Sequence, residues 1–286
     1  MARFNLITWN IQWGRGCDHR VDLPRSVRAA REMADFDVLC VQEVARNFPG
    51  IPGAGGEDQF RLLAELLPGY AAVEGVGTDV RAVDGTRSQF GNMILTRLPV
   101  LQAFRHLLPW PAEPEVPSMQ RVAVEAVLQA PWGLVRVTTT HLEYYSARQR
   151  VAQVERLREL QAEAAAHAQD LDHSRKEGGP FQNAPRPASG ILTADFNFRP
   201  DDPLHARLQA PLGHDAPRYL DAWQIGHPGQ PHAPTNGVFD REQWPEPYAC
   251  DFIFVTRDLA DRVHEVRVDS DTDASDHQPV VLTLNC

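Results

Sequence analysis

The sequence predicts a single α+β domain, and three observations support this prediction. Short apolar runs rich in β-branched and aromatic residues alternate with segments whose apolar residues recur at helical spacing. No shift in composition marks a boundary between domains, and no internal repeat is found. Large αβ folds commonly occupy a length of 286 residues as one domain. We therefore expect one domain over residues 1–286.

The first half of the chain is expected to hold five strands and two helices. The strands are runs of aliphatic and aromatic residues, and Leu98-Pro99 marks a turn between the last two of them. The helices are expected where apolar residues recur every three or four positions. Strands are predicted over 4–11, 37–44, 70–76, 89–96 and 100–107, and helices over 23–35 and 57–67.

The second half begins with a hairpin. Residues 122–129 alternate with period two, and Pro131-Trp132-Gly133 turns the chain into a second strand over 134–142. The clearest helix covers 146–171, where one apolar stripe lies among Arg and Glu. Further strands are predicted over 190–196, 250–256, 262–268 and 279–284, a short segment over 219–225, and long loops over 107–119, 174–188 and 226–249.

The charge balance limits the partners that the protein can have. The chain carries 28 Lys and Arg against 38 Asp and Glu, a formal net charge of −10. This argues against capture of nucleic acid by a broad basic face, but leaves open a nuclease that uses a metal ion and a few arginines. Lys176 is the only lysine, and with the abundant Ala, Pro and Gly this composition is typical of a GC-rich bacterial gene.

The same composition indicates where the protein works. No signal peptide and no membrane span is recognised in the sequence. The four cysteines lack the spacing of a zinc site or a disulfide framework, and Cys40 and Cys250 lie in apolar runs typical of a core. We therefore expect a reduced, cytoplasmic protein.

Acids and amides occur at the ends of several predicted strands, where ordinary turn residues would be expected. Clustered buried carboxylates are costly unless they hold a cation. All of these groups are oxygen donors and no thiolate is expected among them, so the pattern favours Mg²⁺ or Mn²⁺ over zinc. The residues concerned are Asn10, Glu43, Asp195, Asn197, Asp251 and the run Ser275-Asp276-His277.

Each of these residues also has an ordinary structural explanation. Asn10 could cap a strand end, the Asp195-Phe196-Asn197 run could be a turn, and His141 could be a satisfied core histidine. Residues 275–277 could form a surface loop. The occurrence of all of them along one chain favours a shared site over separate structural roles.

Seven segments, spread over almost the whole chain, resemble the endonuclease/exonuclease/phosphatase superfamily, which has the deoxyribonuclease I-like fold. The resemblance implies a four-layer α/β/β/α sandwich, in which two mixed sheets pack face to face with helices outside. It also implies Mg²⁺-dependent phosphoester hydrolysis. The matching segments are TWNIQ (8–12), LCVQEV (39–44), GNMILTRLPV (91–100), TTHLEYY (139–145), TADFNFRPDD (193–202), CDFIFV (250–255) and SDHQPVVL (275–282).

The resemblance also implies metal-binding residues. Glu43 resembles the main metal ligand of the family, and Asn10 lies beside it as a metal or phosphate contact. Asp276 resembles a second carboxylate near the metal. The family's usual Gly before the DFN motif is Ala194 here, a change that the site should tolerate.

Catalytic roles follow from the same resemblance. Asp195 resembles the residue that positions or deprotonates the attacking water, and Asn197 the amide that orients the phosphate. His141 resembles the histidine that contacts the phosphoryl or leaving group, and His277 the one that contacts the transition state, with Asp251 as its orienting partner. Tyr144 and Asn92 are further candidates for substrate contact, and Gln12 is expected near the site.

The substrate is left open, because this fold hydrolyses DNA, RNA, phosphoinositides and other phosphoesters. Aromatic residues in the loops could stack on bases or contact apolar groups. A phosphodiesterase or nuclease is the first reading. The alternatives are a phosphomonoesterase for a lipid or nucleotide head group, and a catalytically silent binding protein. We expect a monomer without stable membrane insertion, with residues 107–111 as a weak candidate for membrane contact.

Overall fold

The computed structural model describes residues 3–82, 84–169, 179, 184–213 and 216–286, and its strands form two six-stranded sheets. The first sheet has the order β11-β12-β1-β2-β4-β3, and the second has the order β5-β6-β7-β8-β10-β9. The first is built from β1 (Arg3–Asn10), β2 (Val38–Arg46), β3 (Ala71–Arg81), β4 (Arg87–Thr96), β11 (Val263–Val268) and β12 (Val280–Asn285). The second is built from β5 (Val100–Leu107), β6 (Val122–Ala130), β7 (Gly133–His141), β8 (Gly190–Asp195), β9 (Tyr219–Asp221) and β10 (Asp251–Thr256).

Both sheets are mixed. The β1–β2 pair and the β7–β8 pair are parallel, whereas the neighbouring pairs are antiparallel. The predicted hairpin is confirmed, because β6 and β7 pair antiparallel with Ala130 opposite Gly133.

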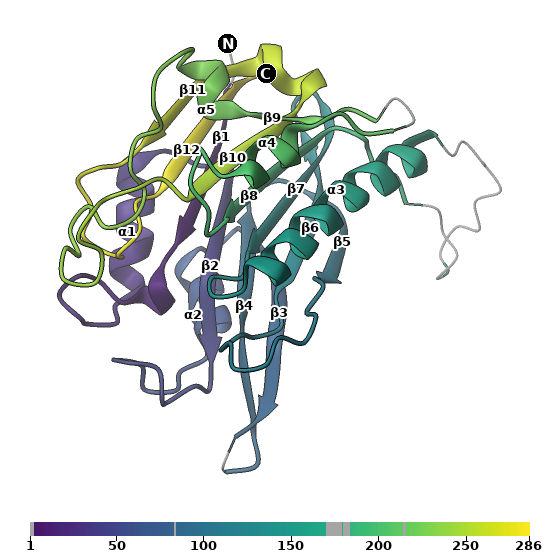
Figure 1. Cartoon of the computed structure of the whole chain (residues 1–286). Coiled ribbons are helices and arrows are strands. Elements are labelled where there is room, and N and C mark those ends of the chain that lie inside the picture. The colour runs from purple at the N-terminus through teal and green to yellow at the C-terminus, as the bar shows by residue number, and fades with distance from the viewer. Residues whose placement is uncertain (1–2, 83, 170–178, 180–183, 214–215) are drawn as a thin grey trace.

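Helices cover the outer faces of the two sheets, as Figure 1 shows. The helices α1 (Leu23–Met33) and α2 (Gln59–Leu66) pack on the first sheet, and α3 (Ala147–Gln169) and α4 (Pro203–Gln209) pack on the second. Short turns complete the fold: η1 (Gln12–Gly14), α5 (Ala222–Gly226) and η2 (Arg257–Arg262). The four-layer sandwich is confirmed. Among the described helices, none is both long and apolar enough to cross a membrane.

The core between the sheets follows from the two-residue period of a strand. In β1, Phe4 and Leu6 face the second sheet, whereas Ile7 and Trp9 face the helices. In β8, Ile191 faces the first sheet and Leu192 faces α3. Side chains two residues apart along a strand therefore point the same way, and we call such a row of side chains a column. Each column between the sheets begins with apolar residues and leads toward one end of the sandwich.

Three parts of the structure differ from the sequence predictions. The strand predicted over 70–76 continues to Arg81, because pairing with β4 extends it beyond its apolar run. The helix α4 was not predicted, and the 219–225 segment divides into β9 and α5. Of the loop predicted over 174–188, residues 174–178 and 180–183 lie outside the described residues.

Candidate active site

Four predicted site residues lie at the ends of the columns between the sheets. The column through Phe4 and Leu6 ends at Asn10, and the column through Val135 and Val137 ends at His141. Strand pairing places His141 opposite Asp195 and Asp195 opposite Asp251, in a row across β7, β8 and β10. The register of the second sheet therefore brings three of these side chains together.

Glu43 reaches this place by a different route. In a regular strand it would follow Leu39 and Val41, which face the α1 and α2 helices. The β2–β4 pairing shifts register between Gln42 and Val44, and Glu43 has a left-handed φ of 61°. Such a bulge inserts one extra residue and re-aims its side chain. Glu43 thus lines the cavity that also contains Asp195.

The loop before β12 is fixed to the end of β1. The hydroxyl of Ser275 donates to the carbonyl oxygen of Asn10 at 2.7 Å, and the indole N–H of Trp9 donates to the carbonyl oxygen of His277 at 2.8 Å. The Gln12 amide donates to Oδ2 of Asp276 at 2.9 Å. Asp276 and His277 are therefore held beside Glu43 although more than 200 residues separate them in sequence.

Asp195 lies at the centre of the cluster and is buried. Its Oδ1 accepts the backbone N–H of Asn197 at 3.0 Å, and its Oδ2 accepts the side-chain amide of Asn10 at 3.0 Å. The same Oδ2 lies 3.4 Å from Nε2 of His141 and 3.7 Å from Nε2 of His277. A single carboxylate oxygen thus faces two imidazoles and one amide.

His141 is held as a neutral imidazole. The amino group of Asn197 lies 2.9 Å from Nε2 of His141 and also donates to the carbonyl oxygen of Leu142 at 2.9 Å. Nε2 is therefore the acceptor, which leaves the proton on Nδ1. Burial and the nearby charge of Arg121 lower the pKa of His141 to about 3. Its Nδ1 is buried without a hydrogen-bond partner among the described residues, and lies 3.8 Å from Oε1 of Glu43.

His277 differs from His141 because a carboxylate lies behind it. Nδ1 of His277 is 2.9 Å from Oδ2 of Asp251, which also accepts the Thr235 hydroxyl at 2.6 Å. Burial acts to lower the pKa of His277, but the charges of Asp251, Asp195 and Asp276 together raise it well above its usual value. The amide nitrogen of Asn236 lies 2.9 Å from Nε2 of His277, so the ring is held between Asp251 at Nδ1 and Asn236 at Nε2.

The donor set fits a hard divalent cation. Burial, followed by the charge of Asp276, raises the pKa of Glu43 to about 7, as expected where carboxylates gather without a counter-ion. Glu43 and Asp276 offer oxygen ligands, which Mg²⁺ and Mn²⁺ prefer. The thiol of Cys250 is 4.0 Å from Nδ1 of His277, but burial and the charge of Asp251 raise its pKa well above normal, so it stays protonated.

Asn10 has an orientation that the sequence did not indicate. Its amide nitrogen donates to Oε1 of Glu43 at 3.1 Å as well as to Asp195, and its oxygen accepts the backbone N–H of Gln12 at 3.0 Å. The oxygen that would bind a metal is thus occupied. In this structure Asn10 bridges the two carboxylates.

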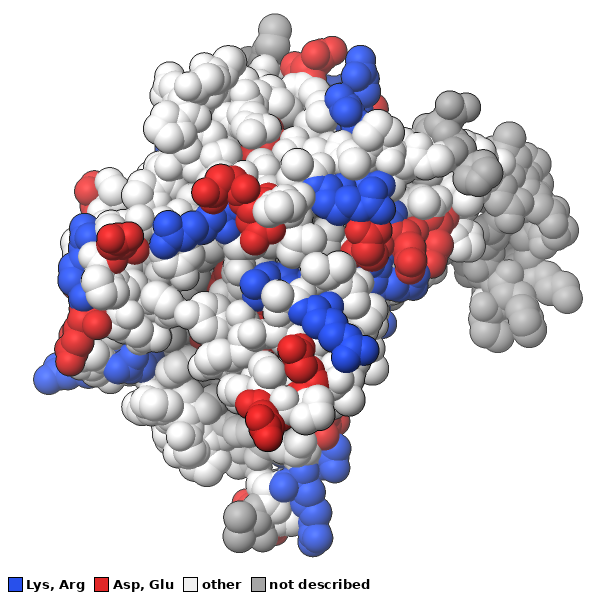
Figure 2. Space-filling view, in the orientation of Figure 1, with Lys and Arg blue, Asp and Glu red and all other residues white. Residues whose placement is uncertain are grey.

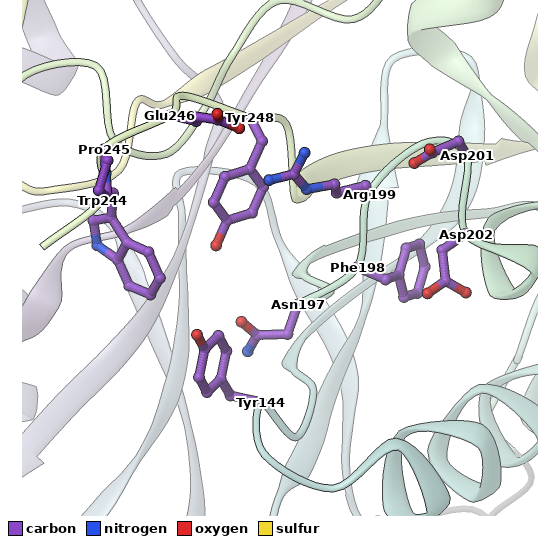
Figure 3. Close-up of a pocket in the computed structure, with 10 residues that line it drawn as sticks. All are labelled: Tyr144, Asn197, Phe198, Arg199, Asp201, Asp202, Trp244, Pro245, Glu246 and Tyr248. Carbon is purple, nitrogen blue, oxygen red and sulfur yellow. The ribbon is translucent and has the colours of Figure 1, made fainter. Parts of the chain in front are cut away.

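Two cavities meet at the cluster. The first has a volume of about 570 Å³, and its polar lining residues include Gln12, Glu43, His141, Asp195, Asn197, Asn236, Asp276 and His277. The second, of about 800 Å³, is drawn in Figure 3, where Tyr144, Trp244 and Tyr248 surround an opening beside Asn197. Tyr144 lines both cavities. Asn92 lines neither of them, because its amide donates to the carbonyl oxygen of Val122 at 2.9 Å.

Among the residues that line the first cavity, Arg121 and Asn236 are polar groups that sequence reasoning missed, whereas Trp244 belongs to the loop aromatics expected near a substrate. Arg121 is buried, pairs with Glu143 through an Nε–Oε2 distance of 3.2 Å, and has no partner for Nη1 among the described residues. The signal available for it was an arginine directly before an apolar strand. Asn236 and Trp244 lie in the long 226–249 loop, where no periodic pattern marks them.

A sandwich of two mixed sheets with this polar cluster at one end of its core is the architecture of deoxyribonuclease I-like proteins. A sequence model of the Endonuclease/Exonuclease/phosphatase family matches residues 7–277, and the chain belongs to this family. Members of the family are phosphoesterases. No curated protein sequence matches the chain.

Solved structures share the fold. An endonuclease/exonuclease/phosphatase from Beutenbergia cavernae has 24% identity and a TM-score of 0.69, with 100% of this chain and 72% of that chain covered. The mannosyl-6-phosphatase of Bacteroides thetaiotaomicron has 17% identity and a TM-score of 0.65, with 99% and 100% covered. TDP2 of D. rerio, complexed with single strand DNA product, has 18% identity and a TM-score of 0.63, with 100% of each chain covered.

Proposed function

We propose that the protein is a Mg²⁺-dependent phosphodiesterase, with Mn²⁺ as the alternative ion. The observation that carries this proposal is the position of Asp195, whose Oδ2 lies 3.4 Å from Nε2 of His141 and 3.7 Å from Nε2 of His277. Such a carboxylate can accept a proton from water while neighbouring donors stabilise the phosphate. A silent binding protein would have no need of this arrangement.

The proposed reaction is attack of water on phosphorus. The water oxygen forms a new P–O bond and the ester P–O bond breaks, so an alcohol leaves and the phosphate retains the attacking oxygen. Asp195 accepts the proton that the water loses. His277, held by Asp251, donates a hydrogen bond or a proton to the phosphoryl or leaving oxygen, and His141 and Asn197 orient the phosphate.

Glu43 and Asp276 are the proposed metal ligands. When bound there, a divalent cation would neutralise the phosphate and polarise its oxygens. Asn10, placed between Glu43 and Asp195, would set the separation of the ligand from the base, and Gln12 would orient Asp276. These contributions follow from hydrogen bonds already present in the chain.

We also propose a substrate class, an oligomeric state and a compartment for the protein. Relatives with this fold include a protein named as a mannosyl-6-phosphatase and one complexed with single strand DNA product, so sugar phosphates and nucleic acid are both candidate substrates. We propose a monomeric, single-domain, cytoplasmic enzyme. The free thiols at Cys17, Cys40, Cys250 and Cys286 are compatible with a reducing compartment.

A substrate panel tests the proposal. Bis-p-nitrophenyl phosphate, p-nitrophenyl phosphate, plasmid DNA, a single-stranded oligonucleotide and phospholipid vesicles are each incubated with Mg²⁺, Mn²⁺ or excess EDTA. We expect metal-dependent release of product from the diester and its loss in EDTA. Undiminished turnover in EDTA contradicts the metal requirement, and turnover of monoesters alone makes the protein a phosphomonoesterase.

A further inference from the structure

The first cavity is lined by two chemically different groups of residues, which we call its polar wall and its apolar wall. The polar wall holds Glu43, Asp195, Asp276 and the two histidines. The apolar wall comes from four separate segments: Trp13, Phe48 with Ile51 and Pro52, Phe90 and Met119. A volume of about 570 Å³ is sufficient for a phosphate and an organic substituent of moderate size.

The aromatic part of this wall is held in place without a ligand. Trp13 has a left-handed φ of 46°, and its indole N–H donates to the carbonyl oxygen of Pro52 at 2.9 Å. The Gln59 amide donates to the carbonyl oxygen of Trp13 at 2.8 Å. Phe48 and Phe90 meet edge to face with their ring centroids 6.4 Å apart. The rings are therefore positioned before any substrate binds, which favours recognition of another ring.

Each of the two cavities has one arginine among its described lining residues, which suits a substrate with a single phosphate. Among the described residues that line the first cavity, Arg121 is the one arginine, and its Nη1 has no partner. The second cavity has Arg199, whose guanidinium already lies 4.7 Å from the ring centroid of Tyr248, together with three carboxylates: Asp201, Asp202 and Glu246. Figure 3 shows Glu246 beside Tyr248, and Asp201 and Asp202 farther along, beyond Arg199 and Phe198. A polynucleotide that continued into this cavity would meet more negative than positive charge.

The charges on the visible surface also argue against a polynucleotide substrate. On the face in Figure 2, arginines are interspersed with acids and do not form one basic surface. With a net charge of −10, the chain is unsuited to following a nucleic-acid backbone away from the site.

We propose that the substrate is a small phosphoester with one phosphate and an uncharged aromatic substituent that packs against Trp13 and Phe90. This inference rests on the proposed function, since it takes the polar wall as the phosphate site. The water-derived oxygen ends on phosphorus as an ester P–O bond breaks. The aromatic group leaves as its alcohol or, when the other ester bond of a diester breaks, stays on the anionic phosphate monoester. Trp13 and Phe90 are specificity residues and take no part in the chemistry.

The test compares leaving alcohols of similar acidity, so that chemical reactivity does not imitate recognition. The substrates are 2-naphthylmethyl, octyl and methyl phosphate, the methyl diesters of the first two, and an oligothymidylate, all assayed with the full chain and Mg²⁺. We expect kcat/KM to be highest for a naphthylmethyl ester. A higher value for the octyl ester or for oligothymidylate overturns the aromatic assignment, in favour of an alkyl or a nucleic-acid substrate respectively.

Substitutions of Trp13 test whether this residue causes the preference for the naphthylmethyl ester. Trp13→Ala should reduce the ratio of kcat/KM for naphthylmethyl over methyl ester by about tenfold or more, mainly through KM, because an apolar contact in a pocket is typically worth that much. Trp13→Phe should restore most of the ratio. Trp110→Ala, which removes an exposed tryptophan outside both cavities, is the matched control and should keep it. An equal loss for every ester in Trp13→Ala contradicts the proposal.

A lack of hydrolysis tests the proposed function, and the aromatic site is then tested by binding. If no ester is turned over with either ion, the proposed function fails. Binding of 2-naphthylmethylphosphonate, octylphosphonate and methylphosphonate is then measured by calorimetry for the wild type and Trp13→Ala. Tighter binding of the naphthyl compound, lost in the variant, supports the aromatic site independently of catalysis. Equal binding of all three compounds overturns it.

Discussion

Asp195 and Glu43 are neighbouring carboxylates in different surroundings. Asp195 accepts the backbone N–H of Asn197 and the amide of Asn10. Glu43 accepts the Asn10 amide but lies near the charge of Asp276, and burial together with this charge raises its pKa. Glu43 is thus the carboxylate that would gain most from a cation.

Glu43→Gln should abolish metal-dependent turnover while the fold persists. The substitution keeps the shape of the side chain but removes a ligand charge, so we expect a loss of about 10² or more in kcat, as for removal of a group that stabilises transition-state charge. Metal that binds the native state raises the melting temperature. Mg²⁺ should therefore raise that of the wild type and leave the variant unchanged.

The control for this experiment is Glu65→Gln, at an exposed position on α2 where the glutamate pairs with Arg61. It should keep both turnover and the Mg²⁺ response. A Glu43→Gln protein with wild-type turnover would exclude this residue as the metal ligand.

His277→Ala should reduce kcat by about 10² to 10³, the usual effect of removing one donor to a transition-state oxygen. Asp251→Asn should have a smaller effect, because it removes only the charge behind the imidazole. Turnover and melting temperature are measured together for both variants. Parallel losses of activity and stability would make His277 a structural residue. A stable, fully active His277→Ala protein would remove it from the mechanism.

At the scale of elements, the two-residue alternation of side chains along each strand determines where the site residues lie. The columns that form the core between the sheets change from aliphatic residues through Thr8, Thr139 and Thr193 to the polar residues at their ends. The pairing of the whole strand fixes where a column ends, so strand register positions Asn10, His141, Asp195 and Asp251.

Another contact between elements joins β6 and β7 on the far side of the second sheet. Oε2 of Glu125 in β6 lies 3.0 Å from Nη1 of Arg136 in β7, and its Oε1 lies 2.9 Å from Nε of Arg186. All three side chains are buried. Burial acts to raise the pKa of Glu125, but the two arginines lower it overall. Glu125→Gln leaves these guanidinium groups without their counter-ion and should cost about 3 to 5 kcal/mol.

The sign of its pH dependence follows from the lowered pKa. A carboxylate whose folded pKa is depressed stabilises the fold above its unfolded pKa of about 4.3, and this contribution is lost as the pH falls through the folded value. Denaturant unfolding of the wild type and Glu125→Gln should therefore differ most near neutral pH, and the difference should shrink as the pH falls through the lowered folded pKa of Glu125. A constant difference across this range would contradict the assignment.

The sequence predicted the long strands and the strand-end residues, because both depend on local patterns. The helix α4 escaped prediction because its signals, the cap Asp202 and Pro203, lie in a Pro-rich stretch and precede only seven helical residues. Arg121 and Asn236 join the site through tertiary packing of loops, which no period records. Asn92 has an amide of the right chemistry, but its position in β4 commits it to the carbonyl oxygen of Val122.

At the scale of the whole molecule, the net charge of −10 sets how the protein meets a polyanion. Any binding of duplex DNA must come from a few arginines and the metal, so we expect weak binding that falls steeply with salt. Fluorescence anisotropy with a labelled duplex, with and without Mg²⁺, measures this between 50 and about 200 mM salt. Tight binding at physiological salt without metal would contradict this prediction.

The bulge at Glu43 makes strand length a requirement for chemistry. Gln42 pairs with Asn92 and Val44 with Gly91, so one residue of β2 has no counterpart in β4. A deletion of Val44 would restore even pairing and turn the carboxylate toward the helices, with Leu39 and Val41. A related chain with such a deletion would retain the glutamate in an alignment and still lose the proposed metal ligand. For this strand, an insertion or deletion predicts loss of catalysis better than the identity of the acid does.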